Sequence, residues 1–238
     1  MTQETRRPMW QYDESKYVGK DYSDPAEVAA YDARHRQFRD MEAENTRIIE
    51  GLEIGKEHTV LDVGAGTGIF ALQVAPLCRQ VHAVDVSNAM LTFAQTRAQE
   101  TGLANIAFHH GGFLTYEHTG EPVDRALSSL ALHHLSDFWK QIGLHRLAGI
   151  MKPGGRLWLH DVVFSFGPKN YETHIEGLFQ GMEAKGGAGL ASDFAAHVRD
   201  EFTTYDWIME GLLRRAGFRI DRAEYQNSVF ATYLCTRL

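Results

Sequence analysis

Three glycines and an aspartate around residues 62–68 form the part of the sequence with the clearest chemical meaning. The run 60–68 (VLDVGAGTG) is an apolar, β-branched stretch followed at once by glycines. Glycine permits a tight turn and lets a ligand approach the backbone without meeting a Cβ atom. A helix that begins after such a turn offers free N–H groups. The pattern predicts a buried strand, a ligand-binding turn and a helix.

The spacing of these glycines separates three classes of ligand. A dinucleotide fingerprint starting at Gly64 needs Gly or Ala at position 69, but Ile69 stands there and Gly68 comes one residue early. A P-loop needs a lysine that this turn lacks. Asp62, just ahead of the turn, disfavours a pyrophosphate and favours a cation, such as the ammonium and sulfonium of S-adenosylmethionine.

A second acid, Asp85, ends the next predicted strand, about 20 residues after the first glycine. That is the spacing at which an acid reaches a ribose, and a carboxylate can accept hydrogen bonds from both hydroxyls of a diol. The alternative is that Asp85 caps the following helix, for which Ser87 is an equally good candidate.

Residues 58–163 are predicted to form alternating strands and helices, which would position the glycine turn, Asp62 and Asp85. This alternation predicts an α/β fold with a doubly wound, mostly parallel, seven-stranded Rossmann-like sheet. Residues 218–225 and 228–236 suit an antiparallel C-terminal hairpin that turns at Gln226-Asn227. The predicted strands of the alternating part are 58–63, 80–84, 105–110, 123–128 and 156–163; its helices are 67–77, 88–101 and 137–151.

Four segments follow from this pattern. Residues 1–50 would be an N-terminal arm and one helix, from about 24 to 50, covering the site. Residues 51–163 would bind the cofactor, 164–203 would be a helical lid insertion, and 204–238 would complete the sheet.

Composition limits the partners. The net charge of −7 leaves no basic field, so no nucleic-acid partner is expected. The sequence contains no run of about 18 apolar residues, so we expect no membrane span. Two unpaired cysteines and a polar N-terminus favour a cytoplasmic location. The oligomeric state is not determined, and a homodimer is one option.

With these motifs in order, the chain resembles the class I S-adenosylmethionine-dependent methyltransferases, particularly the bacterial small-molecule branch that includes ubiquinone/menaquinone-biosynthesis-like enzymes. The resemblance covers about residues 45–163 and 210–220, including the segments 132–135 (LHHL) and 151–155. It implies S-adenosylmethionine as cofactor and methyl transfer to a small-molecule acceptor.

The resemblance also implies which residues hold the cofactor. The glycine turn would cradle its amino-acid part, Asp85 would hold the ribose, and residues after the second to fourth strands would contact the adenine and methionine. Where the family often has an acid for the adenine amino group, this chain has glycine, so we expect backbone groups of Gly112 and Phe113 there. The full set is Asp62, Gly64, Ala65, Gly66, Gly68, Asp85, Val86, Met90, Gly112, Phe113, Ser129 and Leu130.

The acceptor side is less constrained, because a thioether leaving group needs no acid. The enzyme must align the acceptor, exclude water and, for hydroxyl or carbon acceptors, remove a proton. Candidate catalytic residues at the carboxyl ends of the fourth and fifth strands are His134, His160 and Asp161, with His133 beside them. His134 could instead pack at a helix start and bond a backbone carbonyl.

Three tyrosines are candidates for binding the acceptor: Tyr17 and Tyr22 of the arm, and Tyr171 of the insertion. Packing of amphipathic rings is the alternative for each. No spacing calls for a metal site, so none is predicted.

Other functions stay open. One is a non-catalytic or regulatory S-adenosylmethionine-binding protein, suggested by the altered adenine segment. Another is a methyltransferase acting on a protein or RNA; the Asn/Asp-Pro-Pro-Tyr/Phe motif of DNA adenine methylation is absent. A third is a nicotinamide-dependent oxidoreductase, against which Ile69 and Asp62 argue.

Overall fold

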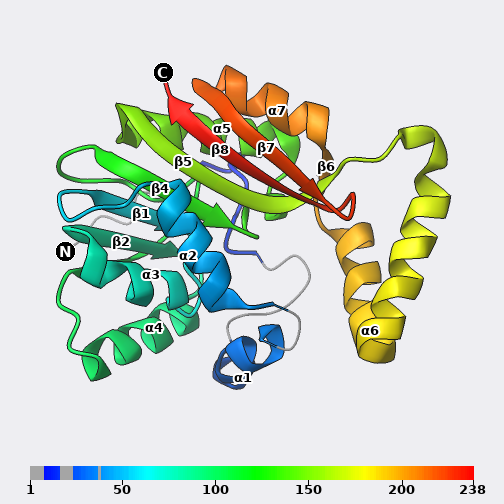
Figure 1. Cartoon of the computed structure of the whole chain (residues 1–238), viewed down its shortest axis with the longest axis horizontal. Helices are drawn as coiled ribbons and strands as arrows, with labels where there is room; N and C mark the ends of the chain where they lie inside the picture. The colour runs from blue at the N-terminus through cyan, green and yellow to red at the C-terminus, as the bar shows by residue number, and fades with distance from the viewer. Residues whose placement is uncertain (1–7, 17–23, 37–38) are drawn as a thin grey trace.

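A twisted central sheet organises the chain, of which the computed structural model describes residues 8–16, 24–36 and 39–238. Its strands lie in the order β3-β2-β1-β4-β5-β8-β7 (Figure 1). Strands β1 to β5 are parallel, and β8 is antiparallel to both β5 and β7. The predicted doubly wound sheet with an antiparallel hairpin is confirmed. The strands are β1 (Thr59–Val63), β2 (Gln80–Asp85), β3 (Ile106–His110), β4 (Val123–Ser129), β5 (Met151–Phe164), a short β6 (Thr204–Tyr205) paired with β5, β7 (Phe218–Gln226) and β8 (Phe230–Arg237).

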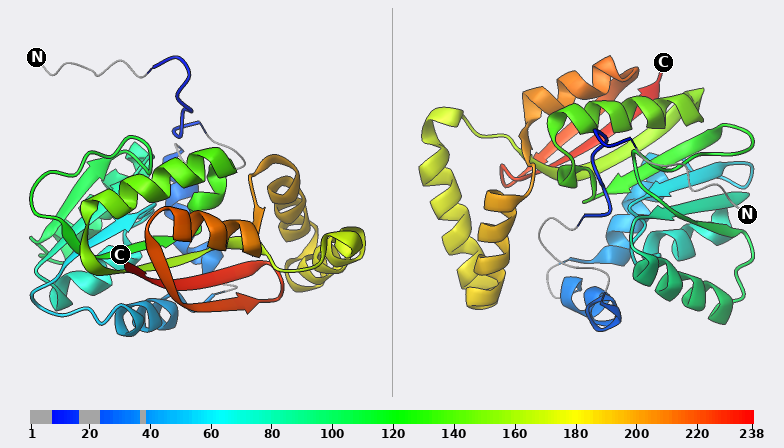
Figure 2. Two further views of the ribbon diagram at one scale, coloured as in Figure 1. Left: turned by 90° about the horizontal axis from the view of Figure 1, so that it is seen from above. Right: turned by 180° about the vertical axis from the view of Figure 1, so that it is seen from behind.

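Helices cover both faces of the sheet, as Figures 1 and 2 show. Adjacent residues of β1 point to opposite faces, so Val60 joins one apolar cluster and Leu61 the other. The Val60 cluster contains side chains of α2 (Met41–Gly51) and α3 (Ile69–Val74), which η1 (Ala75–Leu77) follows. The Leu61 cluster contains side chains of α5 (Asp137–Ile150) and α7 (Asp206–Arg215). Burial on both faces explains why these strands read as continuous apolar runs.

The single helix predicted from about residue 24 to 50 is wrong. The chain forms α1 (Pro25–His35) and a separate α2. Asp24 caps α1 by accepting the Ala26 N–H at 2.8 Å, and Asp40 caps α2 by accepting the Ala43 N–H at 3.0 Å. Asp40 has non-helical backbone angles, and a cap of this kind starts a new helix instead of continuing an old one.

The insertion after β5 contains η3 (Pro168–Asn170) and α6 (Tyr171–Asp200). The backbone of Gly187 (φ 71°, ψ −170°) is not helical, and α6 there folds back into two helical arms. Both views in Figure 2 show this pair extending beyond the sheet. None of the described helices combines the length and apolarity needed to cross a membrane.

The hairpin between β7 and β8 turns one residue later than predicted. Asn227 and Ser228 have φ of 52° and 60°, and the Val229 N–H donates to the Gln226 carbonyl at 3.1 Å. Two central residues with positive φ are typical of a type I′ turn, whose twist matches that of paired strands.

Candidate active site

The glycine turn lies between β1 and α3, at the carboxyl edge of the sheet. The N–H groups of Gly64 and Ala65 both donate to the Val84 carbonyl, at 2.8 and 3.0 Å, which ties the turn to β2. Gly64, Gly66 and Gly68 all have positive φ, of 82°, 53° and 76°. Each position therefore disfavours a residue with a side chain.

The three glycines differ in what surrounds them. A Cβ atom on Gly64 would lie 2.5 Å from the Ala131 Cβ, and one on Gly68 would lie 2.8 Å from the Ala94 Cβ. These two glycines allow close packing within the protein. A Cβ on Gly66 would meet no described atom within 4 Å. The backbone of Gly66 therefore faces open space, as a ligand cradle requires.

Two buried carboxylates lie beside this cradle. Asp62 is 3% exposed and Asp85 is 8% exposed. Asp85 accepts hydrogen bonds from the N–H groups of Gly66 and Ser87, both at 2.8 Å. The Ser87 hydroxyl accepts the Met90 N–H at 3.2 Å and caps α4 (Asn88–Glu100). The capping role is thus filled by Ser87.

The electrostatics of this pair favour a cation. Burial, and then the charge of Asp85, raises the pKa of Asp62 to about 8. Burial also raises the pKa of Asp85 against the effect of its backbone hydrogen bonds. Within the described ranges, no Lys or Arg forms an ion pair with either acid. An ammonium or sulfonium would compensate the charge, whereas a pyrophosphate would be repelled.

The other predicted cofactor residues lie after β2, β3 and β4. Val86 follows Asp85 directly, and Met90 is buried in the first turn of α4. Ser129 ends β4, and Leu130 has a positive φ of 55° while its N–H donates to the His160 carbonyl at 2.8 Å. Such a conformation is uncommon for a large side chain and is found where the surrounding structure enforces it.

Gly112 and Phe113 lie in a loop in which some backbone polar groups already form hydrogen bonds within the protein. The Gly112 N–H donates to the Thr115 hydroxyl at 3.1 Å, and the Phe113 side chain joins the apolar core. A Cβ on Gly112 would lie 2.6 Å from Oε2 of Glu14. Glycine at 112 therefore leaves room for an acid from the N-terminal segment.

Residues 8–16 pack across this edge of the sheet, as the view from behind in Figure 2 shows. The Glu14 carboxylate accepts the Leu114 N–H at 3.1 and 3.0 Å and the Thr115 hydroxyl at 2.5 Å. Sequence analysis missed Glu14 because its partners are about a hundred residues away; the only available signal was the acid missing from the adenine segment. Tyr17 and Tyr22, the predicted acceptor contacts of this arm, lie outside the described residues.

Tyr12 extends this cover toward the short helix η2 (Leu132–His134). Its hydroxyl donates to the His134 carbonyl at 3.4 Å. Its ring lies 6.4 Å from those of both Trp139 and Phe202, measured between centroids. These contacts place an aromatic side chain of the N-terminal segment next to His134.

A network of acids and histidines lies under η2. Asp161 is fully buried and accepts the Leu132 N–H at 2.8 Å and the His133 N–H at 3.2 Å. Its other oxygen lies 2.5 Å from Nδ1 of His133, whose Nε2 lies 3.2 Å from Oε2 of Glu201. Burial alone would lower the pKa of His133, but the charges and hydrogen bonds of Asp161 and Glu201 raise it to about 9. Glu201 also pairs with His197.

His134 differs from its neighbour. Burial, and then the charge of His133, lowers the pKa of His134 to about 4, so its imidazole is neutral at neutral pH. Its Nδ1 is buried and has no hydrogen-bond partner among the residues described. The alternative role of His134, a hydrogen bond from its side chain to a backbone carbonyl, does not involve this atom.

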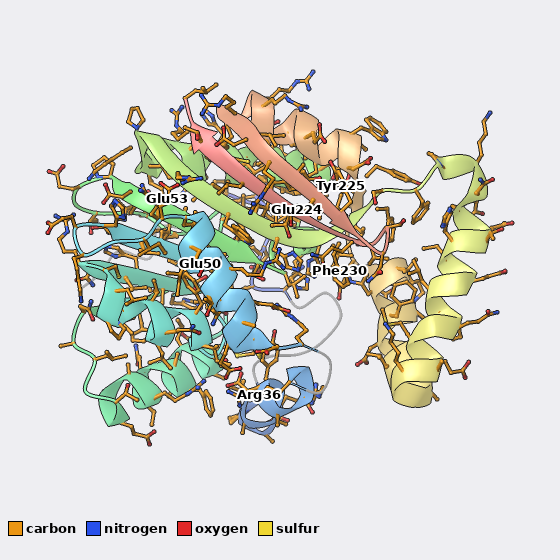
Figure 3. All side chains as sticks on the ribbon, in the orientation of Figure 1. Arg36, Glu50, Glu53, Glu224, Tyr225 and Phe230 are labelled. Carbon is orange, nitrogen blue, oxygen red and sulfur yellow. The ribbon has the colours of Figure 1, made fainter. Side chains whose placement is uncertain are left out.

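The other two acceptor-side candidates have different surroundings. Nδ1 of His160 lies 2.9 Å from the Thr232 hydroxyl, and its ring stacks 5.8 Å from that of Phe230, labelled in Figure 3. Tyr171 begins α6, is 54% exposed and donates to Glu172 at 3.0 Å. The structure therefore gathers His134 and Asp161 around His133. Sequence analysis missed Glu201 and His197, because both lie at the far end of the helical insertion, more than 60 residues after His133 and His134.

The strand order, the open glycine turn and the paired buried acids define the architecture of a class I S-adenosylmethionine-dependent methyltransferase. Residues 60–155 match the family described as methyltransferase domain. The chain is a methyltransferase, and S-adenosylmethionine is its cofactor. The oxidoreductase alternative is set aside.

Known proteins similar to this chain include methyltransferases described as uncharacterized. One is the uncharacterized methyltransferase GK2543 of Geobacillus kaustophilus, 27% identical over 83% of this chain and 84% of that protein. Another is the uncharacterized methyltransferase YcgJ of Bacillus subtilis, 33% identical over 48% of this chain and 44% of that protein. Among solved structures, a SAM-dependent methyltransferase from Aquifex aeolicus has the same fold: TM-score 0.63 and 19% identity, covering 90% of this chain and 99% of that one.

Proposed function

We propose that this chain transfers a methyl group to a small-molecule acceptor by in-line displacement, as in the bacterial small-molecule branch of class I. The observation that carries the proposal is the pairing of an open backbone at Gly66 with two buried acids, Asp62 and Asp85, which have no Lys or Arg partner among the described residues. That combination suits a cationic donor with a diol. The aromatic cover from residues 8–16 supports a small acceptor, because it narrows access to the same edge of the sheet.

The donor-side residues bind and orient. The donor supplies an electrophilic methyl group on a sulfonium and leaves as a neutral thioether. Asp85 is fixed by two backbone N–H groups, and its remaining lone pairs can accept ribose hydroxyls. Asp62 becomes ionised when a cationic group compensates its charge. Glu14 places a carboxylate beside Gly112, and we propose that it takes the part of the acid missing after β3.

The acceptor-side residues remove the proton of the methyl acceptor. A bound donor would supply the methyl carbon and retain the electron pair of the C–S bond that breaks, so this chain's residues would need only to accept the proton released by the acceptor atom. We propose His134 as the base that accepts this proton, because its imidazole is neutral and one ring nitrogen is unpartnered. Asp161 acts through His133 as a positioning residue. His160 remains a predicted catalytic residue, and Tyr171 remains a predicted contact of the acceptor.

Binding and turnover are tested in order. Tag-free protein is titrated calorimetrically with S-adenosylmethionine and S-adenosylhomocysteine, with NAD as the control ligand. S-adenosylhomocysteine formation is then followed over a panel of small hydroxyl, amine and carbon acceptors, with a peptide pool and an RNA pool as parallel arms. Product from the small-molecule arm supports the proposal. Product from only the peptide or RNA arm, or tight donor binding with no product anywhere, refutes the small-molecule acceptor.

A further inference from the structure

Three side chains with metal-binding atoms meet beside the acceptor-side network. His133 and His134 belong to η2, and Glu201 follows the end of α6. One ligand atom from each lies within 4.8 Å of the other two. The Nε2 of His133 and Oε2 of Glu201 are 3.2 Å apart. Two ligands held about 2.1 Å from one ion in tetrahedral or octahedral geometry are separated by about 3.0–3.4 Å. The spacing therefore suits one shared ion, with a small movement of the third ligand.

The charges around this cluster favour a cation. The Asp161 side chain is 0% exposed and that of Glu201 is 11% exposed, and both contact His133. The neighbouring Lys140 is paired with Asp137 at 2.9 Å and bonded to the Phe202 carbonyl, so its charge is already compensated. With neutral imidazoles the cluster carries two buried negative charges. A proton on His133 compensates one, whereas a divalent cation compensates both.

The surrounding contacts resemble the support that metal ligands usually have. A ligating histidine commonly donates its other ring N–H to a carboxylate, and Asp161 holds Nδ1 of His133 in this way while Nε2 faces Glu201. Glu201 is also bonded by His197, whose Nε2 lies 2.7 Å from the Thr203 hydroxyl.

The third side chain of the cluster, His134, carries an unpartnered ring nitrogen. Nδ1 of His134 is buried and makes no hydrogen bond to any described residue. A buried polar atom without a partner is destabilising unless something binds it. The rings of His133 and His134 are in contact, with centroids 4.2 Å apart.

We propose that His133, His134 and Glu201 bind one divalent transition-metal ion, of the zinc or manganese type. Two imidazoles and one carboxylate favour such an ion over Mg²⁺ or Ca²⁺, which prefer oxygen ligands. Three protein ligands leave coordination positions open, as in catalytic metal sites. In the metal-loaded protein the His134 imidazole holds the ion, so the proton-accepting role proposed above for His134 belongs to the metal-free protein. Adjacent histidines and a glutamate 67 residues later form no recognisable sequence spacing, so the site depends on the fold.

The test measures metal binding without donor or acceptor, so its result is independent of the proposed reaction. Tag-free protein is stripped with a chelator and titrated with Zn²⁺ against a chromophoric indicator, and the bound metal is counted by elemental analysis. We expect one ion per chain. His134→Gln and Glu201→Gln should each weaken binding at least tenfold, about 1.4 kcal/mol. Asp161→Asn should weaken it about 10- to 100-fold through the orientation of His133.

Matched controls separate this site from adventitious binding. His109 lies 3.0 Å from His82, and the His118 ring lies 5.0 Å from that of His82, so this group offers three imidazoles without a carboxylate. His109→Gln should leave the affinity unchanged. His134→Gln breaks no hydrogen bond of the Nδ1 atom, so it should fold, which circular dichroism checks. Zn²⁺ should raise the Tm of the wild type but not of His134→Gln. Less than one ion per chain, wild-type affinity in both ligand variants, or equal loss in His109→Gln would overturn the proposal.

Discussion

Replacing Gly66 by alanine tests whether the glycine turn is a ligand cradle. Gly66 has φ of 53°, and a Cβ there meets no described atom within 4 Å. The substitution keeps the N–H that donates to Asp85. Its cost to folding is therefore mainly left-handed backbone strain, about 1–2 kcal/mol. For a chain of 238 residues each kcal/mol lowers Tm by about 2–4 °C.

Gly102 provides a matched control. It follows the end of α4, has φ of 68°, and a Cβ there also meets no described atom within 4 Å. Gly102→Ala therefore carries the same strain without filling the cradle. The two variants should lose similar stability in thermal melts.

Donor binding should separate the two variants. A methyl group inserted into a close contact costs about 1–3 kcal/mol, which is about a 5- to 150-fold rise in Kd. Calorimetry with S-adenosylhomocysteine should show this rise for Gly66→Ala and wild-type affinity for Gly102→Ala. Equal Kd values for both variants and the wild type would refute the assignment of the cradle.

Three further predictions concern titration and the N-terminal cover. Because the pKa of Asp62 is raised to about 8, S-adenosylhomocysteine binding at pH 7 should release up to about one proton; calorimetry in buffers of different ionisation enthalpy should show this, and Asp62→Asn should abolish it. Glu14→Gln should weaken the docking of residues 8–16 by about 1.5–3 kcal/mol, since its charged hydrogen bonds become neutral. Hydrogen exchange at residues 8–16 should then become faster. The control is Glu117→Gln, whose side chain is 80% exposed and which should leave this exchange unchanged. Burial, and then the neighbouring histidines His109 and His118, lowers the pKa of His82 to about 4. The folded protein then binds fewer protons than the unfolded chain between about pH 4 and 6.5, so stability should fall as pH drops through this window. His82→Gln should reduce that slope in pH-dependent melts, and an unchanged slope would contradict the assignment.

Local patterns in the sequence determined the sheet and the donor side of the site. Asp62 and the three glycines lie within residues 62–68, and Asp85 ends the next strand. Adjacent parallel strands therefore bring them together, independently of the distant parts of the chain. The hydrophobic periodicity and the turn residues were sufficient to predict these strands, because the strands are buried on both faces and bounded by glycines. The break between α1 and α2 was missed because Asp40 reads as an ordinary polar residue of a helix face until its cap geometry is known.

Only the tertiary structure decided the acceptor side. Glu14 meets the 112–115 loop across about a hundred residues, and Glu201 meets His133 across 68. Contacts of this range depend on where the arm and α6 return to the sheet, and no local pattern encodes that. The sequence alone thus specified the candidate methyl-donor site. The fold decided which acids and histidines lie beside it, because packing brings together groups that the chain keeps far apart.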